Sequence, residues 1–138
     1  TFIKGDASSV DVSFGRGAFE AVILLGSLEH FGLGYYGDPL NANADWTTLH
    51  RVAGWLVPGG WCYYDVPWTP VYGGHYVTEN RHFRVYDDDS ITRLDAGGKL
   101  RPVKRMYAHG QTDVAQPIRP DSPATPFWYL QRLVEKDA

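Results

Sequence analysis

The sequence is poor in several features that would narrow its function at once. Its 138 residues include one cysteine, which excludes an internal disulfide, and Cys62 lies in a strand-like run where a small buried side chain is expected. No stretch approaches the roughly 20 apolar residues that span a bilayer, so no membrane partner is expected. No basic segment followed by an apolar one opens the chain, as a signal peptide would. These absences predict a cytoplasmic protein.

A large excess of charge of one sign is also absent. The formal net charge is -3 at pH 7, and the 13 basic residues are scattered among 16 acidic ones. Binding of nucleic acid through a broad surface requires a massed positive face. A nucleic-acid partner is therefore not expected.

The chain also lacks a methionine at its start. It opens at Thr1, and Phe2 and Ile3 read as the last residues of a strand rather than the first residues of a protein. A chain of 138 residues is long enough for one domain with its own core and no more. We therefore expect residues 1–138 to form a single, incomplete domain that lacks its front portion.

The pattern that is present is clearest between residues 19 and 67. Residues 18–25 form a nearly continuous apolar run, which is typical of a central parallel strand. A helix is predicted over residues 45–56, capped by Asn43 or Asp45 and ended by the PGG at residues 58–60. A second strand is predicted over residues 61–66. In such a βαβ unit, ligands bind outside the carboxyl ends of the strands.

The rest of the chain predicts shorter elements around this unit. Residues 2–4 look like a short strand, residues 10–14 a loop or weak strand, and residues 67–80 a long loop. A short helix is predicted at residues 91–94. Strands are expected at residues 100–108 and 127–134, with a proline-rich loop at residues 116–126 between them. The fold class is therefore α/β.

Several polar residues follow the predicted strands. His30 beside Glu29 can take a proton near neutral pH, although neighbours on a strand point to opposite sides and need not cooperate. Tyr36 and Asp38 lie in the glycine-rich loop at residues 32–39, which matches no phosphate-binding fingerprint; they can orient a polar substrate or fix the loop itself. Asp6 can accept a hydrogen bond from an amino group or complete its own turn.

A metal site is not expected. His75, Glu79 and His82 raise the question, but their spacing matches neither the zinc-protease pattern nor a cysteine-based site. A metal-dependent enzyme would require these three side chains to converge on one point.

Five short motifs follow one another in an order seen in a known family. They are GDA at residues 5–7, FEAV at 19–22, LEH at 28–30, LHRV at 49–52 and LVPGG at 56–60. Together they resemble class I S-adenosylmethionine-dependent methyltransferases, in which a GDA turn, an FD-x-V strand, an LEH strand end and an L-x-R-V-L-x-P-G-G helix succeed one another. Glu20 stands where that family has an aspartate, at a strand start where we expect the change to be tolerated.

Two further segments resemble the little-characterised DUF268-like branch of that family. The sequence EHFGLGYYGDP, at residues 29–39, is similar to a loop in which GLG-x-YGDP follows EH. The sequence HFRVY, at residues 82–86, is similar to a downstream H-R-x-Y element. The resemblance runs from residue 5 to about residue 94.

The resemblance implies a partial Rossmann-like class I methyltransferase sheet with S-adenosylmethionine as the cofactor. Asp6 would contact the adenine amine, and Ala7 would line the same pocket. The cofactor would also be bordered by Leu25, Gly26 and Ser27. The residues facing a small-molecule or sugar-like acceptor would be Glu29, His30, Tyr36 and Asp38. Of these, His30 is expected to be the base.

Two features of that family are not in this sequence. They are the glycine-rich turn after strand one and the acid after strand two that binds the ribose hydroxyls. The first two strands would lie between strands three and four, so their loss leaves an edge strand without a neighbour. An upstream segment, another chain or a displaced third strand would fill the gap. We expect weak or absent cofactor binding by this chain alone. The alternative function is a non-catalytic, methyltransferase-like scaffold or subunit.

Overall fold

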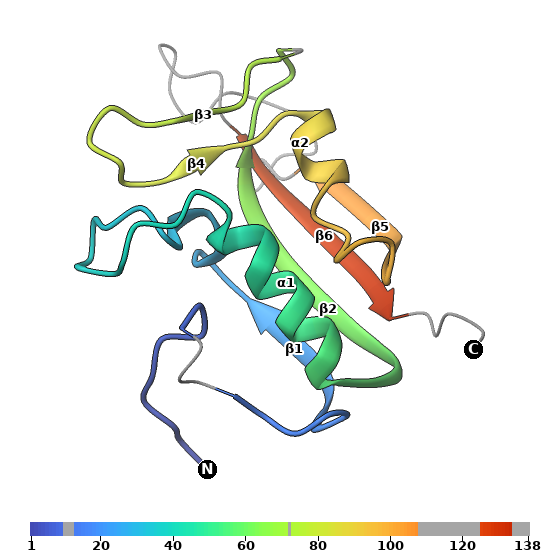
Figure 1. The fold of residues 1–138 in the computed structure, drawn as a ribbon. Helices are drawn as coiled ribbons and strands as arrows, with labels where there is room; N and C mark the ends of the chain where they lie inside the picture. Colours follow the sequence, from blue (N-terminus) through green and yellow to red (C-terminus); the bar gives the residue numbers. More distant parts are fainter. Residues whose placement is uncertain (10–12, 72, 108–124, 134–138) are drawn as a thin grey trace.

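A four-stranded mixed sheet is the centre of the molecule (Figure 1). The structure is a computed structural model that describes residues 1–9, 13–71, 73–107 and 125–133. The strands are β1 (Phe19–Leu24), β2 (Leu56–Trp68), β5 (Leu100–Tyr107) and β6 (Thr125–Leu133), and their order in the sheet is β1-β2-β6-β5. Strands β1 and β2 are parallel, whereas β6 is antiparallel to both β2 and β5. The predicted α/β class is confirmed.

The predicted βαβ unit is present. Helix α1 (Ala44–Trp55) begins one residue before the predicted start and ends one residue before the predicted end, and Asn43 occupies its N-cap position. The PGG segment, predicted to stop the helix, lies inside the long strand β2, where the pairing with β1 shifts register. Gly60 has no room for a side chain there, because a Cβ would lie 2.9 Å from the Val57 carbonyl oxygen and 3.1 Å from that of Glu20.

The core lies between one face of the sheet and the two helices, which Figure 1 shows on the same side. Helix α2 (Asp88–Thr92) starts three residues before the predicted short helix, because Asp87 and Ser90 form a capping box at its start. Leu94, just after this helix, accepts hydrogen bonds from the Tyr64 hydroxyl (3.1 Å) and the buried Gln131 amide (2.8 Å). Burial raises the pKa of the Cys62 thiol to about 12, as expected for an unreactive core side chain.

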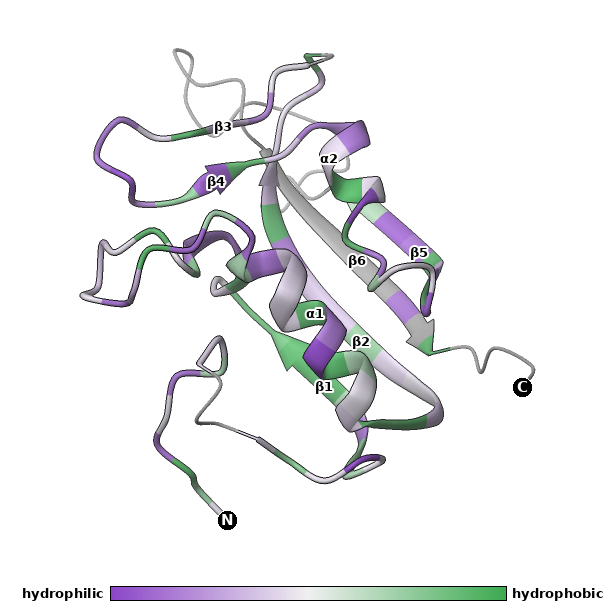
Figure 2. Cartoon of the chain, viewed as in Figure 1, coloured by the Kyte–Doolittle hydropathy of each residue, from purple (hydrophilic) through white to green (hydrophobic). Residues whose placement is uncertain are grey.

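The predicted strand at residues 2–4 is not formed. These residues have irregular backbone, and the Phe2 and Ile3 side chains are largely exposed. A strand needs a partner for its backbone groups, and within the described residues β1 pairs with β2 alone. Figure 2 shows β1 as a largely hydrophobic edge strand. Within the described residues, the sheet therefore has an open edge beside β1. Residues 10–12 of the weak strand predicted at residues 10–14 lie outside the described residues.

A short hairpin stands beyond the carboxyl end of β2. It consists of β3 (Tyr76–Val77) and β4 (Arg84–Val85), which pair antiparallel within the segment predicted to be a loop and just after it. The predicted strands at residues 100–108 and 127–134 correspond to β5 and β6, and residues 116–124 of the proline-rich loop lie outside the described residues. None of the helices described is long and apolar enough to span a bilayer.

Candidate functional site

A hollow of about 580 Å³ lies at the carboxyl end of β1. Three segments of the chain meet there: the turn after Lys4, the connection that follows β1, and the glycine-rich loop. Among the predicted site residues, those that line the hollow are Asp6, Gly26, Ser27, His30, Tyr36 and Asp38. The hollow stands where ligands bind in open α/β sheets.

One carboxylate oxygen of Asp6 accepts hydrogen bonds in a local turn, and the other accepts none from the described residues. Its Oδ1 accepts hydrogen bonds from the Ser8 backbone N–H (2.8 Å) and the Ser8 hydroxyl (2.7 Å), which close a local turn. Its Oδ2 accepts no hydrogen bond from the part of the chain that the structure describes. The turn role and a ligand role, considered as alternatives from the sequence, are therefore compatible.

Gly26 joins the ends of the two parallel strands. It adopts a left-handed conformation with φ of 51°, and its N–H donates to Asp65 Oδ1 at 2.7 Å. Asp65 lies near the end of β2 and was not among the predicted site residues. Its position before Val66 and Pro67, at the end of a predicted parallel strand, was the signal that could have identified it. This bond fixes the backbone beside Ser27, which is half-buried in the hollow.

Glu29 and His30 lie in a single turn of 3₁₀ helix, η1 (Leu28–His30), rather than on a strand. The His30 Nε2 atom is 3.6 Å from Glu29 Oε1. Glu29 is buried behind His30, and its Oε2 has no hydrogen-bond partner among the described residues. Burial, reinforced by the charge of Asp65 and opposed by a backbone hydrogen bond, raises the pKa of Glu29 to about 7. Glu29 therefore changes between its protonated and ionised forms near neutral pH.

His82, from the distant β3–β4 hairpin, holds the other side of this site. Its backbone carbonyl accepts a hydrogen bond from His30 Nδ1, which places the proton on Nδ1 and leaves Nε2 of a neutral His30 able to accept one. The His82 ring lies 3.1 Å (Nε2) from the Tyr36 hydroxyl and stacks on Tyr35 with centroids 4.2 Å apart. His82 therefore positions both predicted polar residues, His30 and Tyr36.

The three residues weighed as metal ligands make separate contacts. His75 Nδ1 lies 3.5 Å from Asp87 Oδ2, whereas His82 contacts Tyr35 and Tyr36. Glu79 is exposed. Across the described ranges, no group of three or more His, Cys, Asp or Glu side chains is arranged to hold a metal ion.

Asp38 is the most informative residue of the hollow. Both of its carboxylate oxygens are buried, and neither has a hydrogen-bond partner within the described residues. A buried polar atom without a partner is costly, by about 1–3 kcal/mol for each group. An arrangement of this kind fits a ligand that supplies N–H or O–H donors to Asp38.

The remaining predicted residues lie beside the hollow rather than in its lining. Ala7 is half-buried, and its carbonyl accepts a hydrogen bond from the Arg51 Nη1 atom at 2.9 Å. Leu25, just past the end of β1, is exposed. Glu29 is not in the lining, but its Oε1 atom lies 3.6 Å from Nε2 of His30, which is.

Comparison with known proteins gives similar solved structures. No family model and no curated protein matches this sequence. A Burkholderia thailandensis 1,6-didemethyltoxoflavin-N1-methyltransferase, solved with 1,6-didemethyltoxoflavin and S-adenosylhomocysteine, is similar over 97% of this chain and 51% of its own, with a TM-score of 0.66 and 17% identity. The [4+2]-cyclase SpnF is similar over 96% of this chain and 55% of its own, with a TM-score of 0.64 and 13% identity.

A third similar structure is the N-methyltransferase NodS from Bradyrhizobium japonicum in complex with S-adenosylhomocysteine. It matches 95% of this chain and 53% of its own length, with a TM-score of 0.55 and 17% identity. This chain spans about half the length of these solved structures. The fold is thus α/β, with a partial Rossmann-like sheet of the class I methyltransferase kind. Among the described residues, this sheet lacks the strand predicted at residues 2–4 as well as the two strands whose motifs are absent from the sequence.

Proposed function

We propose that this chain is the carboxyl-terminal portion of an S-adenosylmethionine-dependent methyltransferase that acts on a small-molecule or sugar-like acceptor. The observation that carries the proposal is Asp38, which lines a hollow at the carboxyl end of β1 and whose two buried oxygens have no partner among the described residues. Asp6 and His30 line the same hollow. Residues 1–138 would form a single, incomplete domain.

The proposed cofactor site consists of the residues around the ends of β1 and the first turn. The unused Oδ2 of Asp6 would accept a hydrogen bond from the adenine amine, and Ala7 would back this contact. The cofactor would further be bordered by Leu25, Gly26 and Ser27. S-adenosylmethionine, when bound, supplies a methyl group on a positively charged sulfur, and the protein supplies binding and orientation.

The proposed acceptor site is formed by the histidine and the glycine-rich loop. Asp38 and Tyr36 would orient the acceptor by accepting and donating hydrogen bonds. The proton that leaves the acceptor oxygen or nitrogen would pass to Nε2 of His30, since the His82 carbonyl keeps the other ring nitrogen protonated. Glu29, buried behind His30, would stabilise the resulting imidazolium when it is ionised. Alignment of the acceptor with the methyl group would supply most of the rate.

Membership of the DUF268-like branch is part of this proposal, and the geometry of the loop at residues 32–39 supports it. Gly32 has a φ of 73°, and a Cβ there would lie 2.2 Å from the Asn41 carbonyl oxygen. Gly34 and Gly37 are also left-handed. The glycines of the GLG-x-YGDP pattern therefore have backbone roles that place Tyr36 and Asp38 in the hollow. A cytoplasmic location stays a prediction.

An upstream segment or another chain is the proposed partner of the open sheet edge. The backbone of β1 has one neighbour, β2, within the described residues. Ile23, Leu25 and Trp61 are exposed apolar side chains at this edge and on the face away from α1. A strand paired with β1 and a helix over that face would cover both.

A non-catalytic scaffold or subunit is the second candidate. The sequence carries no glycine-rich turn for the methionine part of the cofactor, and a similar fold is found in the cyclase SpnF, so the fold by itself does not fix the chemistry. The two candidates differ in whether the complete protein binds the cofactor.

Calorimetry with S-adenosylhomocysteine tests the proposal. We expect no micromolar binding by the 138-residue chain and micromolar binding by the whole gene product. In the latter, Asp6→Ala should weaken binding about tenfold, by loss of one hydrogen bond to the adenine. Asp89→Ala, an exposed carboxylate on α2, is the matched control and should have no effect. Absence of binding by the whole gene product would favour the scaffold instead.

A further inference from the structure

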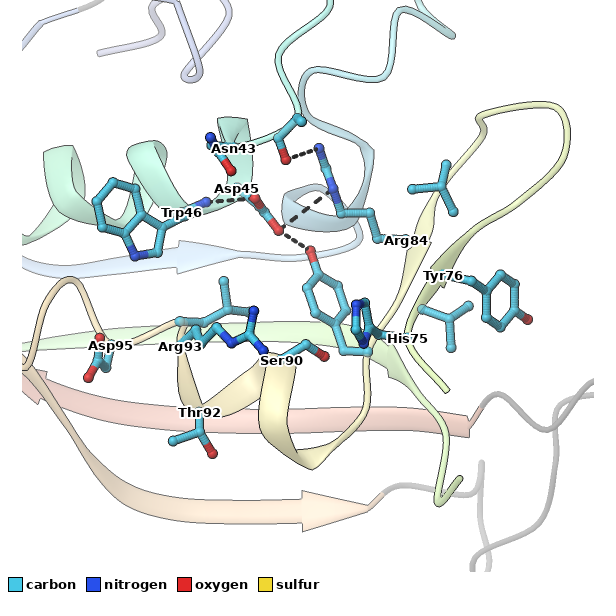
Figure 3. A pocket seen from close by; sticks show the side chains of 15 residues that line it. Asn43, Asp45, Trp46, His75, Tyr76, Arg84, Ser90, Thr92, Arg93 and Asp95 are labelled. Atoms are coloured by element: carbon cyan, nitrogen blue, oxygen red, sulfur yellow. Dashed lines mark hydrogen bonds and ion pairs between the residues drawn. The ribbon is translucent and has the colours of Figure 1, made fainter. Parts of the chain in front are cut away.

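Strand β4 is fastened beside His30 by a buried arginine. The Nη1 atom of Arg84 donates a hydrogen bond to the carbonyl of Phe31, the residue after His30. Its Nε atom lies 3.7 Å from Asp45 Oδ2, which also accepts the Tyr86 hydroxyl at 2.8 Å. Figure 3, which looks into a hollow lined by Asp45 and Arg84, shows these contacts of Asp45 as dashed lines. Hydrogen bonds from a charged donor are strong, so β4 is held firmly against the turn that contains His30.

A threonine hydroxyl closes the turn between β3 and β4. The Thr78 N–H donates to the Phe83 carbonyl at 3.0 Å, and the Thr78 carbonyl accepts the Arg81 N–H at 2.8 Å. The Oγ1 atom of Thr78 accepts two successive N–H groups, that of His82 at 3.0 Å and that of Phe83 at 3.3 Å. The hydroxyl donates in turn to Asn80 Oδ1 at 2.9 Å. One side chain therefore holds the backbone on both sides of His82.

The peptide group between His82 and Phe83 connects this hydroxyl to the imidazole of His30. Its N–H donates to Thr78 Oγ1, and its carbonyl, which is that of His82, accepts from His30 Nδ1. The N–H and the carbonyl belong to one rigid plane, so a side chain that holds the N–H also directs the carbonyl. Hydrogen bonds in such a chain also strengthen one another. Thr78 thus acts on His30 through a single peptide group.

A second neighbour of the imidazole favours the opposite tautomer. Glu29 Oε1 lies 3.6 Å from Nε2 of His30, and the pKa of Glu29 is about 7, so this carboxyl group is ionised above neutral pH. An ionised carboxylate can only accept hydrogen bonds, and it therefore favours a proton on Nε2. The His82 carbonyl favours a proton on Nδ1 for the same reason. The competition between these two acceptors sets the tautomer of a neutral His30.

We propose that Thr78 is a positioning residue that keeps the proton of neutral His30 on Nδ1 through the His82–Phe83 peptide group. The Nε2 atom is then free to take a proton from the acceptor, as required by the proposed function, on which this role of Thr78 rests. The tautomer itself is a property of the chain and can be measured without the cofactor. Without the hydroxyl, the His82 carbonyl is held less firmly, and the proton moves towards Nε2 and Glu29.

Two-bond ¹H–¹⁵N correlation spectra of the ¹⁵N-labelled chain report which nitrogen of each imidazole carries the proton. The spectra are recorded at about pH 8.5, where Glu29 is ionised and histidine side chains are ordinarily neutral. The His30 signals are identified by their absence from His30→Gln. We expect the native chain to show the Nδ1–H form. Thr78→Val should shift the ratio of the two tautomers about fivefold towards Nε2–H, which is the effect of one ordinary hydrogen bond.

Two variants separate the hydroxyl from other effects of substitution. Thr78→Ser keeps the hydroxyl and should keep the native ratio. Thr92→Val is the matched control, because it removes a hydroxyl that donates to the Asp88 carbonyl at 2.8 Å on α2, and it should leave the ratio unchanged. The amide signals of Arg84 and Val85 should stay in place in Thr78→Val, since Arg84 holds β4 independently of the threonine.

Several results would overturn the proposal. They are an Nε2–H form in the native chain, an unchanged ratio in Thr78→Val, and an equal shift in Thr78→Ser or Thr92→Val. Displaced signals of Arg84 and Val85 in Thr78→Val would overturn it as well, because the hydroxyl would then hold the whole hairpin rather than one carbonyl. Failure of the whole gene product to bind S-adenosylhomocysteine is a separate outcome, which would remove the proposed function and leave the tautomer result standing.

Discussion

The Nε2 atom of His30 lies 3.6 Å from Oε1 of Glu29, although the two residues are consecutive in the chain. On a strand these side chains would point to opposite faces of the sheet. The 3₁₀ turn of η1 brings them together, and the His82 carbonyl orients the imidazole from the other side. One short backbone turn therefore brings His30, the proposed proton acceptor, next to the buried carboxyl group of Glu29.

Glu29 should make the stability of the chain depend on pH. Its pKa is raised in the folded state from 4.5 to about 7, so the folded state binds a proton more tightly than the unfolded state does. The contribution of Glu29 to the free energy of unfolding is therefore largest below about pH 4.5, and it is lost as the pH rises through about 7. The full difference corresponds to about 3 kcal/mol.

Urea unfolding at pH 5, 6, 7 and 8 measures this dependence. The variant Glu29→Gln carries no titrating group and should give a flatter profile, with its relative gain in stability greatest at pH 8. Glu20→Gln, which alters an exposed glutamate on β1, is the control and should keep the original profile. If the free energies of unfolding of the native chain and of Glu29→Gln changed with pH in the same way, Glu29 would have an ordinary pKa in the folded state.

The carboxylate of Asp38 should lower the stability of the folded chain, although it contributes to binding of the acceptor. Its two oxygens are buried without partners in the described part of the chain, so Asp38→Ala should raise the free energy of unfolding by about 1 kcal/mol. In the whole gene product the same change should lower kcat/KM for the acceptor. Asp95→Ala removes a carboxylate that accepts the Gly97 N–H and should lower stability instead. Loss of stability in Asp38→Ala would mean that its carboxylate has a protein partner.

His30 should affect turnover more than cofactor binding. In the whole gene product, His30→Ala removes the proposed proton acceptor and should lower kcat about a hundredfold, with little change in the affinity for S-adenosylhomocysteine. His75→Ala alters an exposed histidine outside this hollow and should leave both quantities unchanged. Steady-state kinetics and calorimetry separate the two effects. Unchanged turnover of His30→Ala would exclude His30 as the base.

The strand–helix–strand unit was predictable because its signals are local. The apolar run that became β1 and the spacing of Leu49 and Ala53 on one face of α1 are each contained in a short stretch of sequence. The role of His82 was not predictable, since it contacts Tyr36 across 46 residues of sequence. The strand expected at residues 2–4 failed for a related reason: its apolar side chains fit a strand, but the described part of the chain gives them no strand to pair with.

The glycines of the loop at residues 32–39 should differ in their tolerance of substitution. Both Gly32 and Gly37 are left-handed, with φ of 73° and 85°, so an alanine at either position is strained by about 1 kcal/mol. At Gly32 the added Cβ would also meet the Asn41 carbonyl oxygen at 2.2 Å and the Ala44 Cβ at 2.5 Å, whereas at Gly37 it would meet nothing within 4 Å.

Urea unfolding of the two alanine variants measures this difference. Gly32→Ala should lose at least about 2 kcal/mol more stability than Gly37→Ala, because the neighbouring backbone at the start of α1 must move. Gly37→Ala is thus the control for backbone strain alone. Equal losses would indicate that the loop shifts freely and that it does not hold Tyr36 and Asp38 in fixed positions.

The open edge of the sheet should cause the 138-residue chain to associate with itself. Strand β1 has unpaired backbone groups on its outer side within the described residues, and the exposed Ile23 adds apolar surface beside them. Exposed, apolar edge strands pair with other chains, and a charge on such a strand prevents this. Ile23→Lys should therefore shift the chain from oligomer to monomer in sedimentation velocity. Val77→Lys places the same charge on an exposed apolar position of β3 and should not. A native chain that sediments as a monomer at high micromolar concentration would contradict the prediction. An equal effect of both variants would contradict it as well, because association would then not depend on the edge of β1.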